Sequence, residues 1–158
     1  MADPNYKYAL KIIAQLESHG HQARLVGGCV RDRILGREPA DYDITTSATP
    51  DQVQACFDKK DLVVVPSGLA HGTVGVKAAA GTMIEVTTLR SDVETDGRHA
   101  SVEFTTSFES DAARRDFTMN AMSEDKNGKI YDYYQGQQHI KEKKIVFVGD
   151  AEARIEED

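Results

Sequence analysis

The sequence predicts an α+β domain in which helices flank a mixed or antiparallel sheet. Helical and strand-like segments interleave irregularly along the 158 residues, and residues 72–90 have the pattern of a β-hairpin. A regular alternation of strands and helices would instead favour a doubly wound parallel sheet. The length is that of one ordinary domain with its own hydrophobic core.

The first elements follow from periodicity and from glycine positions. Apolar residues at helical spacing predict a helix over residues 5–19, which Gly20 ends. Residues 23–28 read as a short strand that breaks at two glycines, and residues 29–36 as a helix ending at a further glycine. Polar and apolar residues alternate over residues 41–46, which predicts a second strand.

A helix over residues 49–57 has the clearest start signal in the chain. Thr49 is its expected N-cap, Pro50 occupies the first helical position and Gln52 the third, which is a capping-box pattern. The apolar run that follows, residues 61–67, predicts a buried strand.

The C-terminal half combines a hairpin with less regular segments. The hairpin of residues 72–90 is expected to turn near Ala80 and Gly81, and residues 90–100, charged and without a period, predict a mobile loop. His71, before the hairpin, reads as a loop residue. The remaining expected elements are a strand at 101–105, a helix at 110–122 capped by Ser110 or Asp111, a strand and turn at 128–136, a strand at 143–149 and a helix from 150 to 158.

Composition and charge narrow the class of protein. Hydrophobic residues make up 40% of the chain and charged residues 28%, as in a globular protein, and no apolar run reaches the length of a membrane span. Without a signal peptide, Cys29 and Cys56 read as reduced thiols, so the expected location is cytoplasmic, away from membranes. A net charge of −7 argues against wrapping nucleic acid with the whole surface. Local basic spots remain at Arg31, Arg33, Arg37, Arg114 and Arg115.

Three carboxylates form a candidate metal site. Asp41 and Asp43 would point to the same face of one strand, because strand side chains alternate. Glu85 would join that face if its strand paired beside theirs. Mg²⁺ commonly binds one or two carboxylates together with substrate phosphates, and Mn²⁺ is an alternative ion. The competing interpretation is a strand end with solvated acids.

Gly27 and Gly28, placed before a helix, form a candidate phosphate-binding turn. Backbone N–H groups at a helix N-terminus bind phosphate when no side chain blocks the approach. Arg31, one helical turn further, can bind a phosphate with its guanidinium group, and Asp32 can orient that arginine. The alternative is an ordinary turn followed by a surface ion pair.

A second polar group lies at Arg114, Arg115, Asp116 and Asn120. Adjacent arginines point in different directions, so one of them is expected to reach a triphosphate or ribose while Asp116 holds its neighbour. Asn120 can donate to and accept from a sugar hydroxyl. The apolar residues between them, expected in the core, are Phe117, Met119 and Met122.

Together these segments resemble a known family. The stretches "LVGGCVRDRILGREPADYDITT", "PSGLAHGTVGV", "IEVTTLR" and "DAARRDFTMNAM" are similar to the head domain of class II tRNA nucleotidyltransferases. This group contains the CCA-adding enzymes and bacterial poly(A) polymerases, within the DNA polymerase beta nucleotidyltransferase superfamily. The resemblance covers nearly the whole chain in the family's order and spacing.

The resemblance implies transfer of a nucleoside monophosphate from CTP or ATP to an RNA 3′-hydroxyl, most simply the tRNA 3′ end, with release of pyrophosphate. It implies that Asp41 and Asp43 are the metal ligands and that Glu85 is a third catalytic carboxylate. The nucleotide would be bound by Gly27, Gly28, Arg31, Asp32, Arg90, Arg114, Arg115, Asp116 and Asn120, with the segment Arg114–Asp116 recognising ribose. Residues 90–100 correspond to a flexible loop that helps to set specificity.

The resemblance also implies a domain boundary. Residues 1–149 would form the head domain, and residues 150–158 would begin a neck helix, with neck, body and tail domains of the same parent chain as partners. Glu157 and Asp158 match the first two letters of the family's base-selecting motif. Residues 136–140 read "GQQHI", where the family has Gly-x-x-Asp-Leu. The 158 residues alone are expected to bind metal and triphosphate without choosing a base, and to add nucleotides poorly or not at all.

Three alternatives remain open at this stage. The first is a poly(A) polymerase, and the second is a non-catalytic nucleotide-binding or regulatory module. The third is an enzyme that adenylylates a small molecule, although such enzymes usually have Gly-Ser before their acids.

Overall fold

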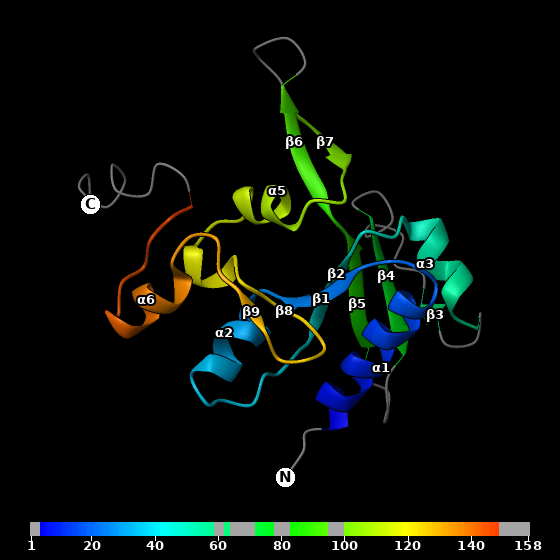
Figure 1. Cartoon of the computed structure of the whole chain (residues 1–158), viewed down its shortest axis with the longest axis horizontal. Helices are drawn as coiled ribbons and strands as arrows, with labels where there is room; N and C mark the ends of the chain where they lie inside the picture. The colour runs from blue at the N-terminus through cyan, green and yellow to red at the C-terminus, as the bar shows by residue number, and fades with distance from the viewer. Residues whose placement is uncertain (1–3, 59–61, 64–71, 78–82, 95–99, 149–158) are drawn as a thin grey trace.

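The computed structural model describes residues 4–58, 62–63, 72–77, 83–94 and 100–148 (Figure 1). Its helices are α1 (Pro4–Ser18), α2 (Gly28–Ile34), α3 (Pro50–Cys56), α5 (Phe108–Ala113) and α6 (Gly136–Lys141), with a 3-10 turn, η3, at Thr118–Asn120. Its strands are β1 (Ala23–Val26), β2 (Asp43–Thr46), β3 (Leu62–Val63), β4 (Thr73–Lys77), β5 (Met83–Thr88), β6 (Arg90–Glu94), β7 (Ala100–Phe104), β8 (Ser123–Glu124) and β9 (Ile130–Tyr131).

The described strands form one mixed sheet and a separate ribbon. Seven of them are arranged in the order β3-β4-β5-β2-β1-β8-β9, and β6 pairs with β7 alone. Strands β2 and β5 are parallel, whereas the other neighbouring strands are antiparallel. The predicted α+β class with a mixed sheet flanked by helices is therefore confirmed. No helix among the described residues is long and apolar enough to cross a membrane.

The two faces of the sheet have different coverings. Leu25 and Ile44, paired in register, are fully buried in a core that also holds the apolar side of α1 and residues of α3. Asp43 and Thr45 alternate with Ile44 and so point to the opposite face. That face is covered in part by α5, whose Phe108 lines a small cavity together with Thr45. The sheet thus separates the hydrophobic core from a more polar side, here called the site face.

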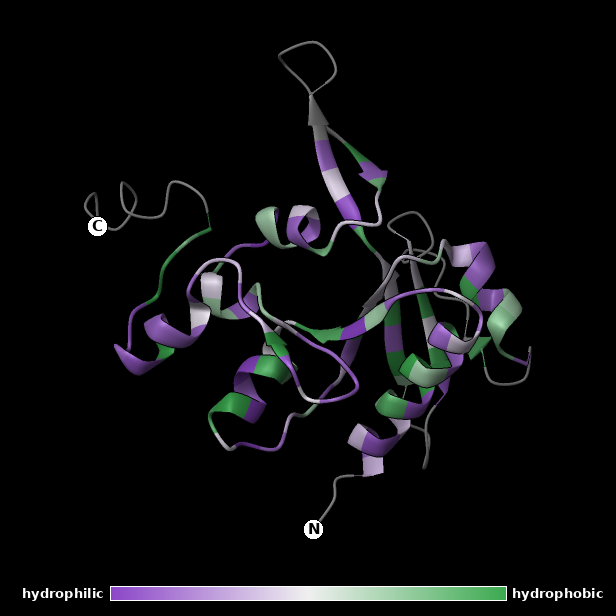
Figure 2. Ribbon diagram, viewed as in Figure 1, coloured by the Kyte–Doolittle hydropathy of each residue, from purple (hydrophilic) through white to green (hydrophobic). Residues whose placement is uncertain are grey.

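The predicted first and third helices are confirmed. The buried side of α1 consists of residues at helical spacing, and Figure 2 shows both hydrophobic and hydrophilic residues along this helix. Gly20 follows it with φ +90°, a conformation that few other residues adopt easily. Helix α3 starts with the predicted capping box, since Thr49 and Gln52 each accept a hydrogen bond from the other's backbone N–H.

Residues 90–94 are not the loop that their charge predicts. They form β6, which pairs antiparallel with β7 from Arg90 opposite Phe104 to Glu94 opposite Ala100. The pairing depends on backbone hydrogen bonds, and the ribbon extends away from the sheet (Figure 1), so its sequence needs no buried apolar side. The strand expected after the loop is confirmed as β7, and residues 95–99 lie outside the described part.

The helix expected over residues 110–122 is shorter and begins earlier. Its N-cap is Ser107, whose hydroxyl accepts the Ser110 N–H, so neither Ser110 nor Asp111 caps it. The helix ends at Ala113, and the backbone is extended at Phe117, which pairs with Phe147 in an isolated β-bridge. This pairing draws the chain out of the helix. Only Met122 of the three expected core residues is fully buried, whereas Phe117 and Met119 are half-buried.

The C-terminal part differs most from expectation. Residues 143–148 contribute the bridge at Phe147 and no strand, while the short strand β8 and helix α6 were not expected. Helix α6 starts without a local cap signal because the Asp132 carboxylate accepts the N–H groups of Gly136 and Gln137. The hairpin of β4 and β5 is confirmed. Its expected turn at residues 80–81, His71, most of the strand at 61–67 and the helix at 150–158 lie outside the described residues, so the domain boundary stays a prediction.

Candidate active site

Two of the predicted carboxylates lie side by side on the site face. Asp43 begins β2 and stands opposite Glu85 of the parallel strand β5, as the hypothesis for Glu85 required. Gly75 of β4 pairs with Glu85 from the other side, so no side chain stands next to it there. Asp41 lies before the strand and not in it, which corrects the prediction that both aspartates belong to β2. Tyr42, between them, is buried, while both aspartates are exposed.

The electrostatics of Asp43 reflect this crowding. Burial raises the pKa of the Asp43 carboxyl, the negative charges of Glu85 and Asp41 raise it further, and the positive charge of Arg115 opposes them. A divalent cation relieves such repulsion between carboxylates. Within the described residues, no three His, Cys, Asp or Glu side chains form a ready metal-binding group. The aspartate pair fits Mg²⁺, which completes its oxygen shell with substrate phosphates and water.

The glycine turn leads directly into α2. Gly27 has φ +81° and ψ −141°, so the backbone at this position requires glycine. A Cβ atom added to Gly27 would lie 3.9 Å from Nη1 of Arg115, and one added to Gly28 would lie 3.2 Å from Nη2 of Arg31. Two guanidinium groups therefore approach the turn, and that of Arg31 comes so close that a side chain at position 28 would crowd it.

Arg31 is held in place from two sides. Its Nε lies 3.2 Å from Oδ1 of Asp32, and its Nη1 donates a 3.0 Å hydrogen bond to Oδ1 of Asn120. Asp32 thus orients Arg31, as expected. Asn120, on η3, is brought to the same arginine from 89 residues away along the chain, a contact that the sequence did not indicate.

The two adjacent arginines point in different directions, as predicted. Arg115 lies at the glycine turn and forms a 3.0 Å ion pair with Asp111, while Arg114 pairs with Asp92 of β6 at 3.1 Å. The expectation that Asp116 holds its neighbouring arginine is wrong. Its carboxylate accepts the N–H of Phe117, which bridges to a distant segment, so Asp116 stabilises the backbone turn.

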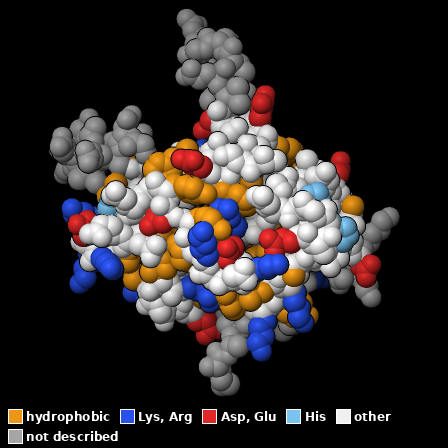
Figure 3. All heavy atoms as spheres, in the orientation of Figure 1, with side chains coloured by type: hydrophobic (Ala, Val, Ile, Leu, Met, Phe, Trp, Pro, Cys, Tyr) orange, Lys and Arg blue, Asp and Glu red, His pale blue; other side chains and the backbone are white. Residues whose placement is uncertain are grey.

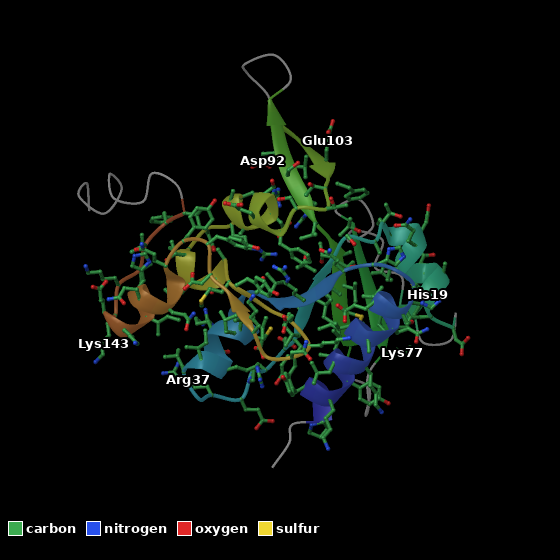
Figure 4. The ribbon with its side chains drawn as sticks, in the orientation of Figure 1. His19, Arg37, Lys77, Asp92, Glu103 and Lys143 are labelled. Carbon is green, nitrogen blue, oxygen red and sulfur yellow. The ribbon has the colours of Figure 1, made fainter. Side chains whose placement is uncertain are left out.

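Arg90 is held next to Arg114 and Arg115 by Asp111 of α5. Its backbone N–H donates a 2.9 Å hydrogen bond to Oδ1 of Asp111. Burial lowers the pKa of the Arg90 guanidinium, and the charge of Arg114 lowers it further, because the arginines are close to one another. Figure 4 marks Asp92 on the ribbon above α5, and Figure 3 shows acidic and basic side chains close together near the centre of this view.

Sequence reasoning missed Asp111 as a site residue. It is 4% exposed and joins the start of β6 to Arg115 through its two carboxylate oxygens. Its spacing of four residues from Arg115 was the available signal, since such pairs meet on a helix. Cys29, the residue after Gly28, is a buried thiol whose pKa is raised by burial to about 11, which makes it a packing residue.

The site face thus combines two carboxylates on neighbouring strands with guanidinium groups at a glycine turn before a helix, the arrangement that the family resemblance implied for a nucleotidyltransferase domain. The family model described as the Poly A polymerase head domain matches residues 23–146. The chain therefore belongs to the poly(A) polymerase head domain family.

Curated relatives of similar sequence support the assignment to this family. The CCA-adding enzyme of Geobacillus thermodenitrificans is 48% identical over 157 residues, covering 98% of this chain and 38% of the relative. Human mitochondrial CCA tRNA nucleotidyltransferase 1 is 43% identical over 151 residues, covering 94% and 35%. The chain spans somewhat over a third of the length of these curated relatives.

A solved structure gives the same picture. The crystal structure of the Bacillus stearothermophilus CCA-adding enzyme in complex with CTP superposes with a TM-score of 0.81 at 46% identity. The match covers 99% of this chain and 37% of that one. The fold of this chain is thus that of the head domain in this CCA-adding enzyme.

Proposed function

We propose that this chain is the catalytic head of an enzyme that transfers a nucleoside monophosphate from CTP or ATP to the 3′ end of tRNA, with pyrophosphate as the leaving group. The observation that carries the proposal is Asp43 beside Glu85, with Arg115 near enough to oppose the rise in the Asp43 pKa. Negative groups for a metal and positive groups for phosphate thus meet on one face.

Each residue has a defined task in this proposal. Asp41 and Asp43 hold the metal ion, and Glu85 keeps the site negative from the neighbouring strand. Arg31 and Arg115 bind phosphate oxygens beside the backbone of Gly27. Enzymes of this superfamily use divalent metal, and we propose Mg²⁺, with Mn²⁺ as a substitute. The bound ion supplies positive charge where the 3′-hydroxyl attacks the α-phosphorus and pyrophosphate leaves.

The remaining nucleotide contacts are proposed from the surroundings of Arg31 and Arg115. Asn120 binds Arg31 and, together with Asp32, fixes the direction of its guanidinium group. Arg90 and Arg114 lie further toward the ribbon, where Arg114 would exchange its ion pair with Asp92 for the nucleotide or the RNA end. Gly28 leaves the space that Arg31 needs near the triphosphate.

We expect calorimetric titration of the 158-residue chain in Mg²⁺ to show similar binding of ATP, CTP, GTP and UTP. The reason is that the site face offers carboxylates, guanidinium groups and backbone N–H groups, which recognise phosphate and metal and not a base. The double variant Asp41→Ala/Asp43→Ala should lose this binding. The control is Asp51→Asn, an exposed carboxylate in the first turn of α3, which should bind as the parent does.

Two results would contradict parts of the proposal. Unchanged binding in the double aspartate variant would remove the metal-site assignment. Strong preference for one base would place base selection in this chain and not in the proposed neck beyond residue 149. The nucleotides that the parent enzyme adds to tRNA distinguish the alternatives. Addition of both C and A would indicate CCA addition, whereas addition of A alone would indicate a poly(A) polymerase. A non-catalytic module would bind nucleotide and incorporate none.

The other domains and the location of the enzyme are also part of this proposal. The parent chain would supply neck, body and tail domains that hold tRNA, and the enzyme would act in the cytoplasm. Curated relatives of this chain include bacterial enzymes and mitochondrial ones.

A further inference from the structure

A small cavity lies on the site face beneath α5. Its polar lining comes from Thr45 of β2, Asp111 of α5, Arg115 and Ser123 of β8. The space open to the centre of a water-sized sphere is about 10 Å³, which is close to the room that one water molecule needs. The cavity therefore joins the sheet to the arginine that faces the glycine turn.

Two lining side chains carry buried polar atoms without a hydrogen-bond partner in the described part of the chain. They are the hydroxyl oxygen Oγ1 of Thr45 and the nitrogen Nε of Arg115. Thr45 is only 2% exposed, so its hydroxyl is cut off from solvent. A buried polar group left unpaired is costly, and one such atom calls for an explanation. Two of them at one cavity point to a shared partner.

The groups around the cavity could bind one water. The Nε–H of Arg115 would donate to the water oxygen, and the water would donate one hydrogen to the carboxylate of Asp111 and one to the hydroxyl oxygen of Thr45. A water molecule buried in proteins typically makes about three hydrogen bonds, mainly to groups otherwise unpaired. Asp111 still accepts directly from Nη2 of Arg115 and from the Arg90 N–H.

We propose that Asp111 and a water molecule bound between Thr45 and Arg115 fix the Arg115 guanidinium beside Gly27. Asp111 and Thr45 are thus positioning residues: they act through Arg115, which leaves its Nη1 side free to face the turn. The inference depends on the proposed function in one respect: the ligand that Arg115 contacts is taken to be a nucleoside triphosphate. The water site itself stands on the cavity and its unpaired atoms.

The variant Thr45→Val tests the water site by the sign of a stability change. Valine keeps the shape of threonine and removes the hydroxyl. If the hydroxyl binds the proposed water, the melting temperature should fall by about 3 °C, because the water loses one of its partners. If the hydroxyl is simply unpaired, its removal should raise the melting temperature, and the proposal is overturned.

The matched control is Thr87→Val. Thr87 stands opposite Thr45 on β5, and its hydroxyl pairs with Thr73 at 3.0 Å instead of lining the cavity. This variant should leave the NMR signal of the Arg115 Nε–H group unchanged. In the parent chain that signal should show a cross-peak to a bound water, and in Thr45→Val the cross-peak should vanish. A parent signal without any such cross-peak would contradict the water.

The variant Asp111→Asn tests the positioning of Arg115. MgATP binding should weaken about tenfold, the order of one hydrogen bond to a charged group, and the Arg115 signal should shift. Asp111→Asn with full affinity and an unshifted signal would overturn the positioning role. The melting and NMR measurements need no nucleotide, so a parent chain that bound no ATP would refute the proposed function while these two measurements still decided the water site.

Discussion

At the scale of single residues, Asp43 carries the main conflict of the site. Its side chain lies next to Glu85 and near Asp41, and the pKa of its carboxyl is raised by partial burial and by both charges. A carboxyl whose pKa folding raises ionises more readily in the unfolded chain, so its ionisation favours unfolding. The residue that suits a metal site is therefore a cost to the metal-free fold.

The variant Asp43→Asn should show this cost as a pH dependence. Between about pH 4 and about pH 7 the metal-free parent chain should lose stability relative to the variant, because stability is lost as the pH rises through the folded-state pKa. At or below about pH 4 the two should melt alike. Thermal melts across this range, with and without Mg²⁺, measure the effect. Mg²⁺ should raise the melting temperature of the parent only, and equal melting of the two chains at about pH 7 would refute the charge conflict.

At the scale of elements, an ion pair between the half-buried Arg33 and the buried Glu124 joins α2 to β8. Nε and Nη2 of Arg33 lie 3.0 and 3.2 Å from the two carboxylate oxygens of Glu124, which is 3% exposed. The Arg33 guanidinium also lies over the ring of Tyr6 from α1, 3.7 Å from its centre. Glu124 points to the core face because it pairs with Leu25, so three elements meet there.

Arg33→Ala should destabilise the fold by about 3 kcal/mol, because it leaves the buried Glu124 carboxylate without its positive partner and with a hydrogen bond from the Tyr6 hydroxyl at 3.5 Å. Chemical denaturation measures the change. Arg37→Ala, an exposed arginine just after the same helix, is the control and should stay within about 0.5 kcal/mol of the parent. The double variant Arg33→Met/Glu124→Leu should recover most of the loss. If the double variant recovered little of the loss, the cause would be lost packing on the Tyr6 ring and not the unpaired charge.

Helix α6 supports the site through a close backbone contact. A Cβ atom on Gly136 would lie 2.5 Å from the backbone oxygen of Thr118 and 3.1 Å from the side chain of Met122. Thr118 begins η3, which carries Asn120 to Arg31, and its hydroxyl lies 2.7 Å from Nδ1 of His139 on α6. Glycine at position 136 thus lets α6 pack on the turn that holds a site residue.

Gly136→Ala should therefore weaken both stability and nucleotide binding. The backbone of Thr118 cannot yield easily, so we expect a loss of about 2 kcal/mol in the free energy of unfolding. Gln137→Ala, an exposed neighbour on the same helix, is the matched control. Denaturation and MgATP titration of both variants provide the measurements. A fully stable Gly136→Ala variant would show that α6 can move away without cost.

At the scale of the whole molecule, the ribbon of β6 and β7 has fewer neighbouring strands to stabilise it than the main sheet has. Strands β1, β2 and β5 lie inside a seven-stranded sheet with a buried face, whereas β6 and β7 pair only with each other. Val102 and Phe104 of the ribbon are both 49% exposed. A two-stranded ribbon is marginal in water unless it packs on another element.

Hydrogen exchange should reveal this difference. We expect ribbon amides of β6 and β7 to exchange at least about tenfold faster than those of β2, because the ribbon can open without unfolding the core. Mass spectrometry or NMR exchange resolves the two regions. The first residue of β6 is the internal comparison, since Arg90 N–H is held by Asp111 and should exchange more slowly than the rest of the strand. Equal protection throughout would mean that ribbon and sheet open together.

Local sequence signals were enough to predict the elements that have a capping residue, a terminating glycine or a clear hydrophobic period of their own. The capping box at Thr49, the stop at Gly20 and the hairpin of β4 and β5 depend on neighbours in the chain, so the sequence alone determined them. The same holds for the glycine turn and for the contact between Arg31 and Asp32, one residue apart. The family resemblance rested on four short stretches that include the glycine turn, and it was confirmed.

Contacts between distant segments were decided only by the tertiary structure. The register that sets Asp43 beside Glu85 was a condition the sequence left open, and Asn120 reaches Arg31 only after the chain folds back. Asp116 holds neither arginine, because its carboxylate accepts the N–H of Phe117 where the chain leaves the helix to form the bridge to Phe147. Each of these outcomes depends on which backbone and side-chain groups are buried together, a competition over the whole chain that no short window of sequence contains.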